Sequence, residues 1–179
     1  MVSFTQQRPL PMRRTTIMIV AIVSIVVAAS PMAPGQEQGR EQSAAIAKDA
    51  IFARKILMDA VSRNMDELET MTSSQKAIDL TEGREHADNV SIMLMAFPHL
   101  FPPGTNQWTP SADRDPGRDT YAAPDLWTKY ADFYAKAASA SKIAYNASRS
   151  KQEGEFKAYV AELRVACDAC HGAYLKNDP

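Results

Sequence analysis

Cys167-Asp168-Ala169-Cys170-His171 lies within the last thirteen residues of the 179-residue chain. Two cysteines separated by two residues and followed directly by a histidine form the pattern by which a chain takes up haem covalently. Each cysteine sulfur adds to one haem vinyl group, and the imidazole of the histidine binds the iron. The late position of the motif is as informative as the motif itself, because it places the haem on the final element of the fold.

Two other uses of this cysteine pair have to be weighed. A redox-active dithiol or disulfide would sit at a helix start after a strand, and no strand pattern precedes the motif. A zinc site needs four ligands, and with two cysteines and three histidines in the chain His86 and His99 would have to converge on it. The sequence therefore favours one haem c, attached through Cys167 and Cys170 with His171 as the proximal iron ligand.

Apolar residues recur at steps of three and four along most of the chain, which indicates amphipathic helices. We expect helices over about 44–71, 77–96, 124–148 and 155–175, after a frayed polar lead-in at 36–43. No strand pattern competes, so the predicted fold is all-α, an antiparallel four-helix bundle. The side chains expected to face inward are Ile51, Met58, Val61, Met65, Leu68, Ile78, Val90, Met93, Leu94, Leu126, Trp127, Tyr130, Phe133, Ala137, Phe156, Tyr159 and Leu163.

The connection between the second and third predicted helices is unusually long. Prolines and glycines are spread over 98–123, and a loop of this length inside a compact domain is often functional or packed on itself. The sequence assigns no role to this loop or to its Trp108. Gly83 is a local weak point inside the second helix.

The spacing of the motif residues predicts how a haem would lie. Residues three and four apart share one side of a helix, so Cys167, Cys170 and His171 project together. On the first helix Met58 and Met65 stand one heptad apart, and either could face the iron, although filling the core is the commoner use of methionine. Arg54 lies four residues before Met58, and a buried arginine needs a partner, for which a haem propionate is suitable.

The start of the sequence has the pattern of a secretory signal. Arginines and no acidic residue precede an apolar run that ends at Ala29 and is too short to span a bilayer comfortably. We expect a signal peptide over 1–35, cleaved after Ala29 or as late as after Gly35, with Met1 or Met12 as the initiator. An uncleaved membrane anchor is the alternative.

The predicted export and the haem motif support each other, because haem is attached to such motifs outside the bacterial cytoplasm. They predict a periplasmic mature domain over 36–179 without a membrane span. Removing the leader takes away three arginines and leaves 17 basic and 21 acidic residues, a net charge of −4. This balance argues against nucleic acid or anionic lipid as a partner.

Four stretches give the chain a more specific likeness. They are ARKILM at 53–58, LFPPG at 100–104, PDLW at 124–127 and ACDACHGAY at 166–174. With these stretches the chain resembles the cytochrome c′ family, the class II c-type cytochromes, over about 44–176. The resemblance implies a four-helix bundle with the haem on its last helix.

The resemblance also implies roles for single residues. In this family the residue four after the first-helix arginine lies over the distal face of the haem, and members with methionine there resemble the low-spin, six-coordinate branch. Met58 is thereby implied as the distal ligand, with Met65 as the lesser candidate, and Arg54 as the propionate partner. Gly172 and Leu175 depart from the charged residues that the family often has at these places, which leaves its spectral and redox behaviour open for this chain.

The function predicted from these features is electron transfer, not enzymatic catalysis, because no acid–base or nucleophile constellation is visible. His171 and Met58 would fill both axial positions of the iron. Redox partner proteins would dock transiently, and the resemblance implies a possible homodimer through the first helices. If Met58 only fills the core, the alternative is a five-coordinate protein that binds nitric oxide or carbon monoxide. A haem-bearing subunit of a larger redox complex is a third possibility.

Overall fold

The computed structural model divides the chain into two units, Met1–Met32 and Ala33–Pro179. It describes residues 34–74, 77–106 and 120–176. The signal peptide predicted over 1–35 falls almost wholly outside the described residues, as does Trp108. Among the helices that are described, none is long and apolar enough to cross a membrane.

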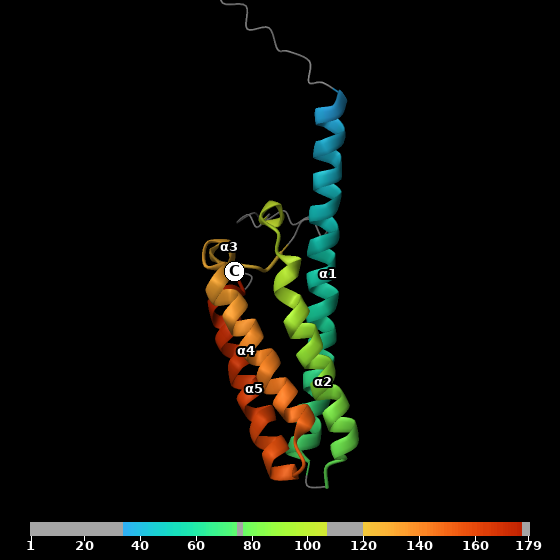
Figure 1. Cartoon of the computed structure of the whole chain (residues 1–179), viewed down its shortest axis with the longest axis vertical. Helices are drawn as coiled ribbons and strands as arrows, with labels where there is room; N and C mark the ends of the chain where they lie inside the picture. The colour runs from blue at the N-terminus through green and yellow to red at the C-terminus, as the bar shows by residue number, and fades with distance from the viewer. Residues whose placement is uncertain (1–33, 75–76, 107–119, 177–179) are drawn as a thin grey trace, which may run out of the picture. The chain divides into compact units, whose positions relative to one another are not determined.

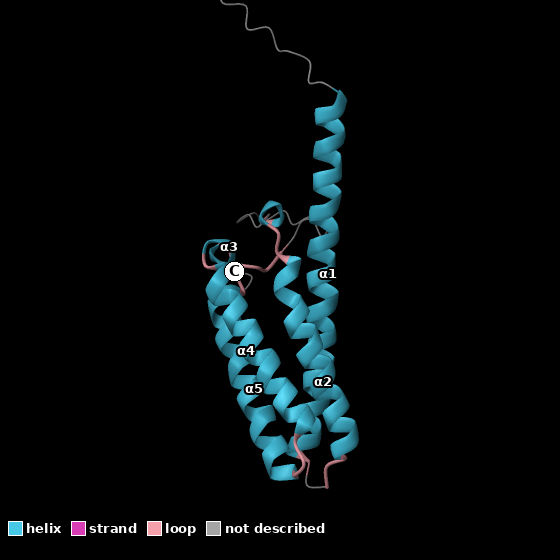
Figure 2. Cartoon of the chain, in the orientation of Figure 1, coloured by secondary structure: helices cyan, strands magenta, loops and turns pink. Residues whose placement is uncertain are grey.

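Four long helices run side by side in alternating directions (Figures 1 and 2). The described residues contain one isolated bridge, between Ala122 and Leu175, and no longer strand. The prediction of an all-α antiparallel bundle is confirmed. The elements in chain order are α1 (Pro34–Ser73), α2 (Leu80–Ala96), η1 (Phe97–Leu100), η2 (Pro103–Thr105), α3 (Asp125–Thr128), α4 (Tyr130–Arg149) and α5 (Glu153–Tyr174).

Two apolar clusters hold the helices together. The larger cluster joins the predicted stripes of α1, α2 and α5, and its centre includes Leu68, Val90 and Leu163, none of which is exposed to solvent. The smaller cluster lies at the end of the bundle where α3 meets the last turn of α5; it consists of Phe101, Leu126, Phe133 and Tyr174. Burying a large apolar side chain contributes about 1.5–3 kcal/mol, so these clusters dominate the stability of the fold.

One predicted inward position needs correction. Tyr130 is 36% exposed, and its hydroxyl donates to the Pro98 carbonyl at 2.9 Å. Ile78 precedes α2 and packs, partly buried, against the larger cluster. Val160, which was not predicted, is also buried in the stripe of α5.

The first two helices begin at other residues than predicted. The expected frayed lead-in at 36–43 is wrong, since α1 is already helical from Pro34. Proline suits the first helical position, and glutamate, glutamine, arginine and alanine favour helix without needing a packing partner. The second helix begins at Leu80 and not at 77, because the side chain of Asp79 caps it by accepting from the backbone N–H groups of Thr81 at 2.9 Å and Glu82 at 3.2 Å.

The third predicted helix is broken in two. Lys129 has φ −114° and ψ 32°, outside the helical region, and separates α3 from α4. The break turns α3 toward the connection after α2, where the indole N–H of Trp127 donates to the Pro102 carbonyl at 3.2 Å. No proline or glycine marks this break, so only the tertiary contacts of α3 account for it.

The late part of the long connection is paired to the end of the motif-bearing helix. The backbone N–H of Ala123 donates to the Tyr174 carbonyl at 2.8 Å, and that of Lys176 donates to the Tyr121 carbonyl at 2.7 Å. The described part of the predicted 98–123 loop is therefore packed against the bundle. This pairing places residues 120–122 beside the site described next.

Candidate haem site

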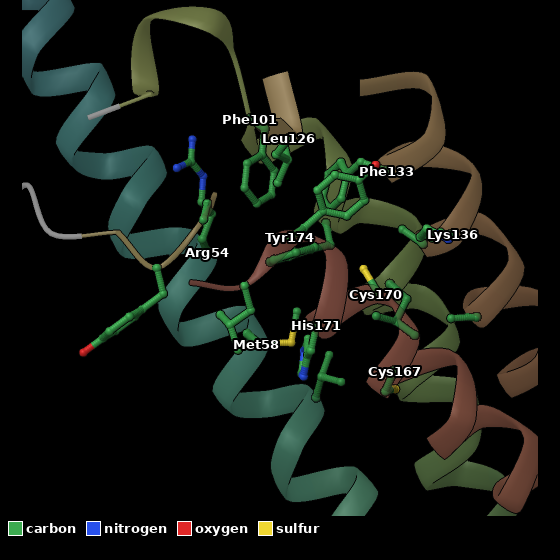
Figure 3. A pocket seen from close by; sticks show the side chains of 18 of the residues that line it. Arg54, Met58, Phe101, Leu126, Phe133, Lys136, Cys167, Cys170, His171 and Tyr174 are labelled. Atoms are coloured by element: carbon green, nitrogen blue, oxygen red, sulfur yellow. The ribbon is translucent and has the colours of Figure 1, made fainter. Parts of the chain in front are cut away.

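A cavity of about 280 Å³ opens between α1, α4 and α5, and the connection after α2 closes one end of it. Its lining is mainly apolar, with Phe101 and Phe133 among the largest apolar side chains. All five residues predicted for the site line this one cavity: Arg54, Met58, Cys167, Cys170 and His171. Figure 3 shows them converging from α1 and α5. Residues about 110 positions apart are thus brought to one place by the antiparallel packing.

The two cysteines are half-buried free thiols on one side of α5. Burial raises the pKa of the Cys167 thiol and that of the Cys170 thiol above the usual value, so both are protonated at neutral pH. Reactive dithiols instead need a lowered pKa, because the thiolate is the nucleophile. The environment of the pair therefore disfavours a redox dithiol and suits sulfurs held against an apolar ligand.

His171 follows Cys170 in the last turn of α5 and is exposed at the mouth of the cavity. Its backbone carbonyl accepts from the N–H of Leu175 at 2.9 Å, which keeps the end of the helix closed. Figure 3 shows the imidazole of His171 and the side chain of Met58 both directed into the pocket, from α5 and α1 respectively.

Both candidate methionines line the cavity, but they differ in burial. Met65 is 1% exposed and belongs to the centre of the larger apolar cluster. Met58 is only partly buried and packs against the edge of that cluster. A side chain at the edge of the core can turn toward a ligand at lower cost than one that the core encloses on every side.

Arg54 is 5% exposed and organises the connection after α2. Its Nε donates to the Leu100 carbonyl at 2.7 Å, and its two terminal nitrogens donate to the carbonyl and the hydroxyl of Thr105. The guanidinium carbon lies 4.1 Å from the ring centroid of Phe101 and 5.3 Å from that of Trp127. Burial lowers the pKa of Arg54 to about 10, so the group stays charged at neutral pH.

Two site residues were missed by the sequence analysis. Tyr174 lines the cavity with its ring, and its hydroxyl donates to the Asp132 carboxylate at 2.5 Å. Lys136 lines the cavity from α4. Its position was visible in the sequence, since it stands three residues after Phe133 and directly before Ala137 on the predicted inward stripe, but a lysine there is easily taken for a surface residue.

The other two histidines lie elsewhere. His86 on α2 has its Nδ1 2.9 Å from the Asn64 amide oxygen, and His99 in η1 stacks edge-on against Tyr134 with ring centroids 6.1 Å apart. Neither lines the cavity. Within the described ranges no three His, Cys, Asp or Glu side chains are grouped so that they could hold a metal ion. The zinc alternative therefore has no set of ligands there.

The residues present fit a covalently bound haem. Two protonated thiols face an apolar cavity, an imidazole stands at its mouth, and a thioether lies on the opposite helix. The charged side chains that line the cavity are all basic and could balance propionates: Arg54, Lys55, Lys136 and Arg164.

Comparison with known proteins agrees with this chemistry. A family model described as Cytochrome C′ matches residues 49–175. A curated relative, cytochrome c-556 of Agrobacterium tumefaciens (strain II Chrys), is 30% identical over 125 residues, which cover 68% of this chain and 92% of the relative.

Solved structures show the same fold. Cytochrome c prime from Shewanella frigidimarina has a TM-score of 0.62 at 23% identity, and cytochrome c′ from Rubrivivax gelatinosus has 0.62 at 25%; each comparison covers 73% of this chain and 97% of the other. Oxidized R. palustris cytochrome c556 has a TM-score of 0.61 at 21% identity, covering 73% of this chain and 98% of the other.

The bundle, its cavity and the matched residues define a c-type cytochrome built on four helices. The chain belongs to the cytochrome c′ family, and its cofactor is one covalently attached haem c. Its function is that of a monohaem protein that either carries electrons or binds a gas.

Proposed function

We propose that the protein is a periplasmic electron carrier whose haem is attached through Cys167 and Cys170 and whose iron is bound by His171 and Met58. The observation that carries this proposal is the placement of Met58 and His171, from α1 and α5, in the same cavity that the two cysteines line. The cytochromes c-556 among its relatives are consistent with the low-spin branch.

Each residue has a definite part in this proposal. When bound, the haem supplies one-electron exchange between ferric and ferrous iron. His171 and Met58 would both hold the iron, so that no position would stay open for a substrate, and the methionine sulfur would favour the ferrous state. Arg54 uses three of its five N–H donors on Leu100 and Thr105, which leaves two for a propionate.

The absorption spectrum of the reduced holoprotein tests this proposal. A low-spin spectrum with sharp α and β bands that carbon monoxide does not change supports the electron carrier. Met58→Ala should convert it to a high-spin spectrum that shifts with carbon monoxide. Met65→Ala is the matched control, since Met65 lines the same cavity, and should leave the spectrum low-spin. If the two variants behave the other way round, Met65 is the ligand.

The alternative is a five-coordinate protein that binds nitric oxide or carbon monoxide. The packing of Met58 against the larger apolar cluster favours it, because a methionine kept in the core would leave the distal face vacant and apolar. A wild-type spectrum that is high-spin and responds to carbon monoxide would establish this alternative and overturn the electron-carrier proposal.

We also propose that the mature domain over 36–179 is exported, and that the signal peptide is cleaved after a residue in the range from Ala29 to Gly35. The mass of the protein isolated from the periplasm measures the cleavage site directly. Recovery of the uncleaved chain in the membrane fraction would instead show an anchor.

The proposed partners are redox proteins that dock transiently and a second copy of this chain that binds through α1 and α2. Large apolar side chains are exposed on these two helices: Phe52 is 64% and Ile56 51% exposed on α1, and Ile92 is 63% and Met95 47% exposed on α2. Exposed apolar area of this kind favours an interface.

Light scattering after size exclusion measures the oligomeric state. We expect a dimer that Phe52→Ser converts to monomer, while Val165→Ser, at a site 68% exposed on α5, leaves it dimeric. A wild-type monomer at every concentration would refute the dimer without affecting the haem proposal.

A further inference from the structure

The basic side chains that line the cavity differ in how far their charge is already balanced. Arg54 is held by the carbonyls of the connection after α2. Arg164 binds the Glu69 carboxylate of α1 and lies 3.8 Å from the Asp168 carboxylate. Two carboxylates therefore face the cation beside Cys167.

Lys136 has a different arrangement. Its Nζ lies 3.9 Å from the Asp132 carboxylate one turn earlier on α4. That carboxylate is shared, because it also accepts the Tyr174 hydroxyl at 2.5 Å. Lys136 lines the cavity whereas Asp132 does not, so the lysine is the member of this pair that borders the cavity.

Cys170 lines the same cavity as Lys136. It also packs against the smaller apolar cluster, in which Tyr174 donates to Asp132. A group attached at Cys170 therefore lies in the field of the same two charges. The lysine side chain is 35% exposed and the aspartate side chain 57% exposed, so water screens the aspartate more than the lysine.

We propose that Lys136 and Asp132 set the reduction potential of the haem attached at Cys170, with Lys136 raising the potential and Asp132 lowering it. This inference rests on the proposed attachment site. Ferric haem carries one more positive charge than ferrous haem, so a nearby cation destabilises the ferric form and a nearby anion stabilises it. Charges next to a redox centre are one of the means by which proteins tune its potential.

Spectroelectrochemical titration of the holoprotein measures the effect. In Lys136→Met we expect the ferric-to-ferrous ratio at the wild-type midpoint to rise about two- to tenfold, a tenfold change being about 59 mV for one electron. In Asp132→Asn, which keeps an acceptor for Tyr174, the ratio should fall. Lys136→Arg should restore the wild-type midpoint. The control is Lys142→Met, which removes the same charge from an exposed site on α4 outside the cavity.

Opposite signs are the decisive result. A disturbance of packing alone has no reason to move the midpoint in opposite directions in Lys136→Met and Asp132→Asn. Shifts of the same sign, or shifts no larger than that of Lys142→Met, would overturn the proposal. If Lys136→Met does not accumulate as a folded protein, Lys136→Gln is measured in its place. The direction of the midpoint shift in Asp132→Asn is measured independently of either lysine variant. The spin state of the wild-type protein tests the ligand proposal separately. The midpoint shifts can be measured whether the iron is low-spin or high-spin, so they test only the roles of Lys136 and Asp132.

Discussion

Arg54 shows how one residue can hold a loop and also line a cavity. Its place on a buried stripe predicted that its charge needs a partner, and the structure supplies the Leu100 carbonyl, both oxygens of Thr105 and the faces of two aromatic rings. Because Phe101 lines the cavity, the contacts of Arg54 also position part of the cavity wall. A planar guanidinium stacks on aromatic rings and holds its donors in a rigid fork, whereas a lysine ammonium has no flat face and only three donors on one nitrogen.

Arg54→Lys should therefore lower stability although it keeps the charge. We expect a loss of about 1–3 kcal/mol, the usual cost of leaving buried hydrogen-bonding groups unsatisfied. Urea unfolding of the holoprotein measures it. The matched control is Arg63→Lys, where an exposed arginine pairs with Asp59 one turn away on the same helix and the expected change is below about 0.5 kcal/mol. Equal losses in both variants would show that the contacts of Arg54 with the connection do not matter.

The hydrogen bond of Tyr174 should make the stability of the fold depend on pH in the alkaline range. Its hydrogen bond to Asp132 is the largest cause that raises the pKa of Tyr174 to about 12, from an ordinary value of 10. Because the folded value is the higher one, the stability that this bond contributes is fully present below pH 10 and is lost as the pH rises through about 12.

Tyr174→Phe should accordingly cost about 1 kcal/mol at neutral pH, and its difference from wild type should narrow between pH 10 and about 12. Unfolding curves across this range measure the difference. Tyr145→Phe, at an exposed site on α4, is the control and should stay within about 0.5 kcal/mol of wild type. A difference that stays constant up to pH 12 would contradict the role given to this hydrogen bond.

Helix bounds agree with the prediction where apolar residues recur with helical spacing. They differ from it where contacts with another element of the fold determine the backbone. Gly83 was expected to weaken the second helix, yet α2 continues through it. The structure explains why glycine stands there, since a Cβ at this position would lie 2.7 Å from Cζ of Phe156, closer than packed atoms approach. The glycine lets α2 and α5 come together, whereas the break at Lys129 arises from contacts of α3 that no local pattern announces.

Gly83→Ala should therefore destabilise the bundle despite the better helix propensity of alanine. The propensity gain is about 1 kcal/mol, and overpacking against a fully buried ring costs about 1–3 kcal/mol, so we expect a net loss of up to about 2 kcal/mol. Gly154→Ala on α5 meets nothing within 4 Å and should be neutral or stabilising. Thermal unfolding of both variants measures the difference, and stabilisation in Gly83→Ala would show that Phe156 yields easily.

At the scale of the whole molecule, the cavity makes the bundle incomplete without its cofactor. Four helices meet around about 280 Å³ of largely apolar space, and an open apolar cavity forfeits the contacts that close packing would supply. We expect the haem-free chain to be less stable than the holoprotein by several kcal/mol, on the scale of large core deletions.

Urea midpoints of the two forms measure this loss. The haem-free chain should also bind a hydrophobic dye that the holoprotein does not bind, as expanded states with exposed apolar surface do. Cys167→Ala, which leaves one thioether in place, should keep the haem and most of the stability. Equal midpoints and no dye binding would mean that the helices close the cavity on their own.

The sequence by itself determined the chemistry and the class of fold. The haem motif is local, so Cys167, Cys170 and His171 stand on one side of a helix wherever that helix lies, and helical periodicity follows from burial that each segment encodes separately. The capping of α2 by Asp79 was not predicted, because short-range geometry competes there with periodicity. The break at Lys129 was not predicted either, because it arises from the contacts of α3.

Only the tertiary structure decided what surrounds the motif. The convergence of Met58 and Arg54 on α5 depends on the register between helices far apart in the chain. The spacing along the first helix left Met58 and Met65 both open, and only the resemblance to a family favoured Met58. The contacts of Arg54 with Leu100 and Thr105, and the place of Lys136 in the cavity wall, had no sequence signal strong enough to predict them. The physical reason is that a side chain's periodicity tells which face it occupies, whereas its partner is chosen by the packing of the whole bundle.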